Sequence, residues 1–113
     1  MTRTNFRMEN ENINMIRGDT VAFGMEIDDL DQDLDFAYFT CKENYTDEAN
    51  LFQKSLGDGI EKIETGKYSI RIAPEDTKDA EAGMYFYDLT IGVNGDVFTV
   101  KKGVWTIEWD VTY

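Results

Sequence analysis

Residues 84–93 read MYFYDLTIGV, and a large apolar or aromatic side chain occupies every second position: Tyr85, Tyr87, Leu89, Ile91 and Val93. This period-two alternation is typical of a β-strand with one buried face. The next two residues, Asn94-Gly95, favour the positive φ angles of a two-residue hairpin turn. A less regular strand is expected at 96–101, and at 104–111 the alternation returns, with one face made of Trp105, Ile107, Trp109 and Val111. The whole stretch therefore predicts β-strands joined by a hairpin turn.

The rest of the chain has the same organisation of short strands separated by turn residues. Four further strands are expected, at 12–17, 20–27, 36–42 and 68–72. Glycine-containing reversals are expected at 57–59 and 64–67. Pro74 followed by acidic residues predicts one short helical turn near 75–81, because proline fits a first helical position and acids suit the positive end of the helix dipole. About seven to nine strands with so little helix indicate an all-β fold, either an antiparallel sandwich or a barrel.

A length of 113 residues predicts a single domain. Residues 1–12 are polar and show no period, so they are expected to form a flexible N-terminal arm before a domain at 13–113. The start of the chain has no apolar segment typical of a signal peptide, and no apolar run reaches the roughly 20 residues that cross a bilayer. We therefore expect synthesis in a reducing cytoplasm, with which a single cysteine agrees.

The chain is strongly acidic, with 11 basic and 23 acidic residues and a net charge of −12. This charge disfavours binding to nucleic acid or to an anionic membrane, since both need clustered Lys and Arg. The chain has no histidine, which excludes a Ser-His-Asp or Cys-His mechanism, and one cysteine cannot form an intrachain disulfide. We expect neither catalytic residues nor a cofactor.

The acidic residues are most concentrated at 28–35, which reads DDLDQDLD. Asp29, Asp31 and Asp33 have the spacing that opens a calcium-binding loop. Leu34 and Thr40, however, stand where that loop needs glycine and a bidentate glutamate. A solvated loop between two strands is favoured, and the three aspartates remain weak candidates for metal ligands.

Aromatic residues make up 13% of the chain. Trp105 and Trp109 share one face of their expected strand, and Phe36 and Tyr38 share one face of theirs, opposite Phe39. Such side chains either form the core or, on an outward face, a protein interface or a sugar-stacking platform. Large residues on both faces of 36–42 indicate that a partner covers part of the outer surface. These four residues are the interface candidates, with core and interface roles both open.

One local motif resembles a signature of immunoglobulin domains. The run from Glu81 to Tyr87 is similar to their acid-Ala-Gly-x-Tyr-x-Cys sequence, in which the tyrosine forms a tyrosine corner. Tyr85 would be the corner residue, and Tyr87 stands in place of the cysteine. The alternative is a strand that begins with Gly-Tyr and has no corner hydrogen bond.

A longer series of motifs has a wider resemblance. In order, they are Ile16–Thr20, an acidic loop, an aromatic strand ending at Cys41-Lys42, Gln53-Lys54, Gly66–Ile70, Pro74–Thr77, Gly83–Leu89, Gly95–Val100 and Asp110–Thr112. This order resembles small phage and prophage virion proteins of Gram-positive hosts, and is similar to the immunoglobulin-like N-terminal domain of phage baseplate upper proteins.

The resemblance implies an immunoglobulin-like β-sandwich that serves as a structural, non-enzymatic part of a phage particle. Its partners would be other virion proteins and further copies of itself, and its location would be the virion after synthesis in the bacterial cytoplasm. Head, neck, tail and baseplate positions all stay open. The alternative is a carbohydrate- or calcium-binding β-sandwich of the cell surface. A third hypothesis, an acidic mimic of nucleic acid, rests on the charge alone.

Overall fold

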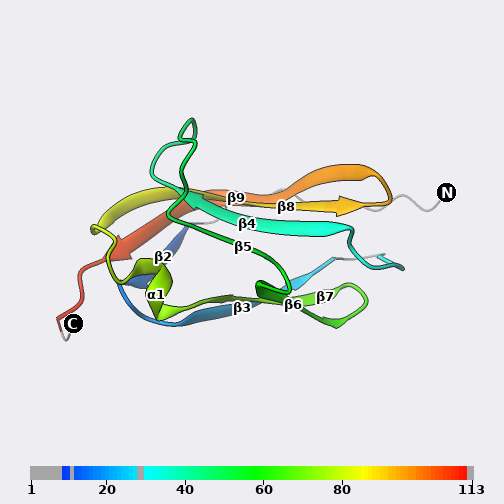
Figure 1. Ribbon diagram of the computed structural model, residues 1–113, viewed down its shortest axis with the longest axis horizontal. Helices are drawn as coiled ribbons and strands as arrows, with labels where there is room; N and C mark the ends of the chain where they lie inside the picture. The colour runs from blue at the N-terminus through cyan, green and yellow to red at the C-terminus, as the bar shows by residue number, and fades with distance from the viewer. Residues whose placement is uncertain (1–8, 11, 28–29, 112–113) are drawn as a thin grey trace.

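The computed structural model describes residues 9–10, 12–27 and 30–111, and these residues form an all-β fold (Figure 1). This confirms the fold class expected from the alternating sequence. The one helical segment in this part of the chain is α1 (Pro74–Thr77). The strands are β1 (Glu9–Asn10), β2 (Ile13–Ile16), β3 (Val21–Glu26), β4 (Phe36–Lys42), β5 (Phe52–Leu56), β6 (Gly59–Glu64), β7 (Lys67–Ile72), β8 (Gly83–Val93) and β9 (Asp96–Glu108).

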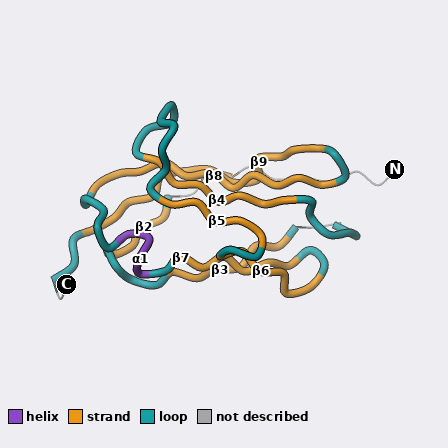
Figure 2. Tube along the Cα trace, viewed as in Figure 1, coloured by secondary structure: helices purple, strands orange, loops and turns teal. Residues whose placement is uncertain are grey.

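The nine strands belong to one continuous mixed sheet with the order β1-β9-β8-β4-β5-β6-β7-β3, and β2 also pairs with β9. β1 and β2 run parallel to β9, and β5 runs parallel to β6 where they meet; the other pairs are antiparallel. Figures 1 and 2 show this sheet folded into two layers, with β4, β8 and β9 in one and β3, β6 and β7 in the other. The hydrogen-bonded path is continuous between the layers, as in an incompletely closed barrel, rather than divided into two separate sheets.

The hydrogen-bonded path passes from one layer to the other between β5 and β6, at the Gly57-Asp58-Gly59 reversal. Both glycines have positive φ angles, 81° and 96°, which residues with a side chain rarely adopt. The expected hairpin turn at Asn94-Gly95 is also confirmed, because both residues have positive φ and Val93 pairs with Asp96.

Three sequence expectations differ from the structure. The strands expected at 96–101 and 104–111 are one strand, β9, which tolerates an irregularity opposite Leu89 and Thr90 and ends at Glu108. The helix begins at Pro74 and ends at Thr77 rather than spanning 75–81, and Ala80 beyond its end is buried in the core. β5 and β6 were not expected, since their sequences FQKSL and GIEKIE lack alternation.

The hydrophobic core lies between the two layers. Phe39 of β4 is fully buried at its centre and contacts the rings of Phe23, Phe52, Tyr87 and Trp105 at centroid distances of 5.3–6.1 Å. These rings come from five different strands, so one cluster of aromatic side chains joins both layers.

The N-terminal arm was expected at 1–12. Residues 1–8 and 11 lie outside the described residues, while Glu9 and Asn10 pair in parallel with Lys101 and Lys102 of β9. Among the residues described, no helix has the length and apolar character needed to span a membrane.

Candidate functional site

The side of β4, β8 and β9 that points away from the core carries the candidate site. Alternation along these strands buries one set of side chains, such as Phe39, Leu89 and Trp105, and turns the other set outward. The registers align the outward positions across the strands, for example Tyr38 with Thr90. We call this surface the outer face; its residues are Phe36, Tyr38, Thr40, Lys42, Met84, Phe86, Asp88, Thr90, Val97, Thr99, Lys102, Val104, Thr106 and Glu108.

Several large apolar side chains of this surface are open to solvent. Tyr38 is 42% exposed, Met84 is 62% exposed and Val97 is 63% exposed. Phe36 lies over Gly92, and any side chain at that glycine would collide with the ring. The rings of Phe36 and Tyr38 are 5.5 Å apart, so they form one aromatic patch. Exposed apolar side chains gathered on one face, rather than scattered, mark an interaction surface.

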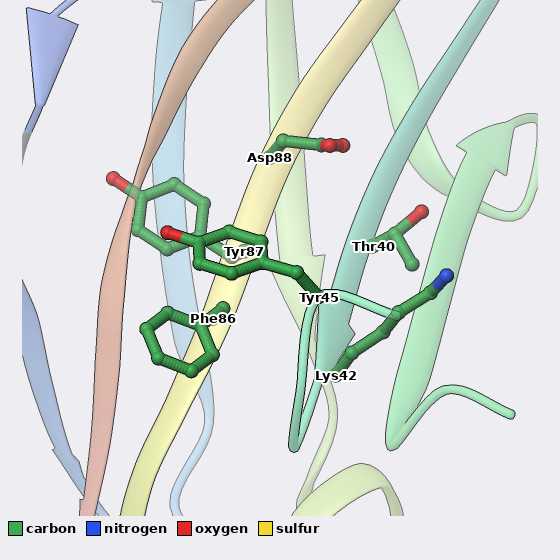
Figure 3. A pocket seen from close by; sticks show the side chains of 6 residues that line it. All are labelled: Thr40, Lys42, Tyr45, Phe86, Tyr87 and Asp88. Atoms are coloured by element: carbon green, nitrogen blue, oxygen red, sulfur yellow. The ribbon is translucent and has the colours of Figure 1, made fainter. Parts of the chain in front are cut away.

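A small open hollow of about 70 Å³ lies at the other end of β4 (Figure 3). Tyr45, from the loop after β4, is 67% exposed and stacks on Phe86 with ring centroids 4.3 Å apart. The stack forms one wall, and polar groups of β4 and β8 form the other. The lining residues are Thr40, Lys42, Tyr45, Phe86, Tyr87 and Asp88.

The outer face is almost neutral, although the chain carries a net charge of −12. Its charged residues are Lys42 and Lys102 together with Asp88 and Glu108, which sum to zero. Asp88 lies opposite Thr40 on β4 and Lys102 on β9. The pKa of Asp88 is raised because its carboxyl group is partly buried; Lys42 and a hydrogen bond from Thr90 oppose this shift without cancelling it. Acidic side chains are therefore concentrated elsewhere, which leaves this face suited to contact with another protein.

The four candidate interface residues lie in three different environments. Phe36 and Tyr38 lie on the outer face. The sequence alone had left both a core role and an interface role open for them. Trp105 is fully buried, so it belongs to the core and is no longer an interface candidate. Trp109 lies beyond the end of β9, is 63% exposed and stacks under the guanidinium of Arg17 at 4.6 Å. The two tryptophans thus do not share one face, because the strand ends between them.

Sequence reasoning missed Tyr45, Met84, Phe86 and Val97. Met84 and Phe86 stand at outward positions of the strand expected at 84–93, so their size was an available signal. Tyr45 lies in a loop without a period, and only the tertiary structure brings it onto Phe86. Large side chains on both faces of β8 are thus the sequence feature that points to this surface.

The acidic loop gives a different result from the outer face. Asp29 lies outside the described residues, while Asp31 and Asp33 are exposed. The carboxylate of Asp33 accepts a hydrogen bond from the ammonium of Lys62, which raises the pKa of that lysine. Within the described ranges, no three acidic or cysteine side chains are grouped closely enough to hold a metal ion.

The tyrosine corner expected at Tyr85 is present. The hydroxyl of Tyr85 donates a hydrogen bond of 2.8 Å to the backbone oxygen of Glu81, four residues upstream. This bond fixes the chain where it enters β8, and so positions one strand of the outer face.

Comparison with known proteins gives no match to any protein-family profile or to any curated protein sequence.

Proposed function

We propose that this chain is a non-enzymatic structural protein of a phage or prophage particle, and that it assembles with other virion proteins through the outer face. The observation that carries the proposal is two groups of aromatic and aliphatic side chains on one sheet face that has no net charge, on a chain with a net charge of −12. The cores of protein interfaces are rich in aromatic residues and methionine and poor in charges, which is the composition found here.

We also infer an immunoglobulin-like arrangement of the strands. β3, β7 and β6 pair in the order of strands B, E and D of immunoglobulin domains, and β4, β8 and β9 pair in the order of strands C, F and G. The Tyr85 corner supports the same interpretation. The continuous pairing through β5 and β6 is the feature that departs from two separate sheets.

The outer face carries large side chains of the kind on which stable protein contacts depend. A standard interface buries about 800 Å² on each partner, with a few large side chains near its centre. Tyr38, Phe36 and Val97 stand at one end of the face, and Met84 and Phe86 with Tyr45 stand at the other. Most of the binding energy is expected from the aromatic residues, because they bury large areas at little entropic cost.

The virion part of the proposal rests on the ordered motifs. It predicts that the genes flanking this one encode capsid, tail or portal proteins, and that the protein co-purifies with density-gradient particles. Neighbouring genes of unrelated metabolic function would count against it.

The test substitutes Val97→Glu on the outer face, with Ile63→Glu as the matched control. Ile63 is 65% exposed on β6, in the other layer, so both variants add one charge at a similarly exposed apolar position. We expect particles assembled with wild type or Ile63→Glu to contain the protein, and particles assembled with Val97→Glu to lack it. Equal incorporation of both variants, with unchanged melting temperatures, would remove the outer face as the assembly surface.

A carbohydrate-binding module is the second candidate, favoured by the hollow beside Tyr45 and Phe86. An aromatic ring next to Thr40 and Asp88 offers a stacking surface and hydrogen-bonding groups to a sugar. Glycan-array binding that is lost in Tyr45→Ala would support this function.

A further inference from the structure

Strand β3 ends the sheet, and its second edge carries no partner strand among the described residues. On its other side it pairs with β7 in an unbroken antiparallel ladder, from Val21 opposite Ile72 to Glu26 opposite Lys67. The ladder has no bulge, so the free edge is straight over six residues. Such an edge is a template on which another extended chain can add a strand.

The register identifies the backbone groups that face this edge. The N–H of Ile27 donates to the oxygen of the directly opposite Gly66 at 2.8 Å, which makes this a hydrogen-bonded pair. Hydrogen-bonded and non-hydrogen-bonded pairs alternate in an antiparallel ladder. Val21, Phe23 and Met25 therefore bond to β7, whereas Ala22, Gly24 and Glu26 point their N–H and C=O groups to the free edge.

β3 lacks the features by which edge strands usually avoid association. It contains no proline, no lysine and no bulge, and Glu26 at its end is its one charged residue. Val21, Phe23 and Met25 pack against the core but are only partly buried. An additional strand would cover these three side chains and satisfy the free backbone groups.

A second copy of this chain can approach the β3 edge even though two chains with a net charge of −12 repel each other overall. Val21–Met25 is uncharged, so two copies can meet there without placing acids together. The carboxylate of Glu26 already has the ammonium of Lys67 at 3.6 Å, and Arg71 on β7 lies opposite Ala22. The edge is thus locally balanced on a chain with a net charge of −12.

We propose that β3 pairs antiparallel with β3 of a second copy about a two-fold axis at Phe23, which joins two nine-stranded sheets. The partly buried side chains stay on the core side only if odd-numbered residues face odd-numbered residues. A centre at Phe23 places Phe23 opposite its own copy and Val21 opposite Met25. Ala22 and Gly24 then form the hydrogen-bonded pairs, and the two Glu26 carboxylates are kept at opposite ends. This dimer deepens the proposed assembly function, on which it rests, but uses a different surface from the outer face.

The first test is light scattering after size exclusion, at protein concentrations between about 1 µM and 1 mM. Wild type is expected to shift from 13.0 kDa toward twice that mass. Ala22→Pro removes an N–H that faces the free edge without removing a bond to β7, and proline is tolerated at such positions. It should raise the dimer dissociation constant about tenfold to a hundredfold, because the symmetry removes two hydrogen bonds.

The second test is a cysteine crosslink, which reports the register. Antiparallel non-hydrogen-bonded pairs bring Cα atoms to about 4.5 Å, within the range that a disulfide bridges. Phe23→Cys should form a covalent dimer on mild oxidation, whereas Ala22→Cys at the same edge should not. Cys41 is buried, so it does not confuse the readout.

Three outcomes would overturn the β3 dimer: a wild type that stays monomeric, a dimer that Ala22→Pro leaves unchanged, or equal crosslinking of both cysteine variants. A dimer lost in Val97→Glu but kept in Ala22→Pro would assign self-association to the outer face instead. Particle incorporation of a monomeric Ala22→Pro variant would separate this inference from the proposed function, since assembly would then survive without the β3 contact.

Discussion

Tyr85→Phe removes one oxygen atom and, with it, the tyrosine-corner hydrogen bond to Glu81. The bond is 2.8 Å long, and the Tyr85 ring is buried at the start of β8. A neutral hydrogen bond of this kind contributes about 1 kcal/mol net to the free energy of unfolding. Glu81 itself is exposed, so water can solvate its carbonyl in the variant and no large penalty for an unpaired group is added. We therefore expect a loss of about 1 kcal/mol and a melting temperature lower by about 4 °C.

The assay is urea unfolding followed by tryptophan fluorescence. Trp105 is fully buried in the native state, so its emission reports the loss of the core. Tyr45→Phe is the matched control: it also removes one phenol oxygen, but from an exposed ring whose stacking on Phe86 persists. The control should change the free energy of unfolding by much less than Tyr85→Phe.

The same variant predicts a dependence on pH. Burial raises the pKa of Tyr85 above its ordinary value of 10.0, and Glu43 and Glu81 act in the same direction. A folded-state pKa above the unfolded one means that the neutral phenol stabilises the fold below about pH 10 and that this contribution is lost as the pH rises through the folded pKa. The stability difference between wild type and Tyr85→Phe should therefore shrink above pH 10. A midpoint unchanged by Tyr85→Phe at neutral pH, or a difference that stays constant to pH 11, would refute the reasoning.

Three further predictions concern buried side chains of the core and of α1. Burial raises the pKa of Cys41 to about 12, so a maleimide should label it only as fast as the protein unfolds; rapid labelling of folded protein would contradict this. Phe39→Ala should lower the free energy of unfolding by about 3–5 kcal/mol in urea titrations, because it empties the centre of the aromatic cluster, and a loss below 1 kcal/mol would show that the cluster collapses freely. Thr77→Val should cost about 1–3 kcal/mol by calorimetry, since the buried Thr77 hydroxyl accepts the N–H of Gly18 at 2.9 Å; a neutral effect would mean that another acceptor replaces it.

Strands and turns could be predicted from the sequence where a pattern of neighbouring residues determines them. The strand expected at 36–42 has those bounds in the structure, and the strand at 84–93 differs by one residue. Asn94-Gly95 forms its turn because both residues adopt positive φ at little cost. The local motif left the Tyr85 corner open against a strand start without it, and the structure contains the corner hydrogen bond, which spans only four residues.

What the sequence by itself determined is thus the period of each strand and the chemistry of each turn, since both depend on neighbouring residues. Only the tertiary structure decided which of the two faces of a strand is covered. Period two separates Phe39 from Tyr38, but the burial of one and the exposure of the other depend on strands 13 to 66 residues away. The same physics separates Trp105 from Trp109 and leaves one edge of β3 open. A side chain is buried, or an edge paired, only where a distant segment packs against it, and no local pattern records that contact.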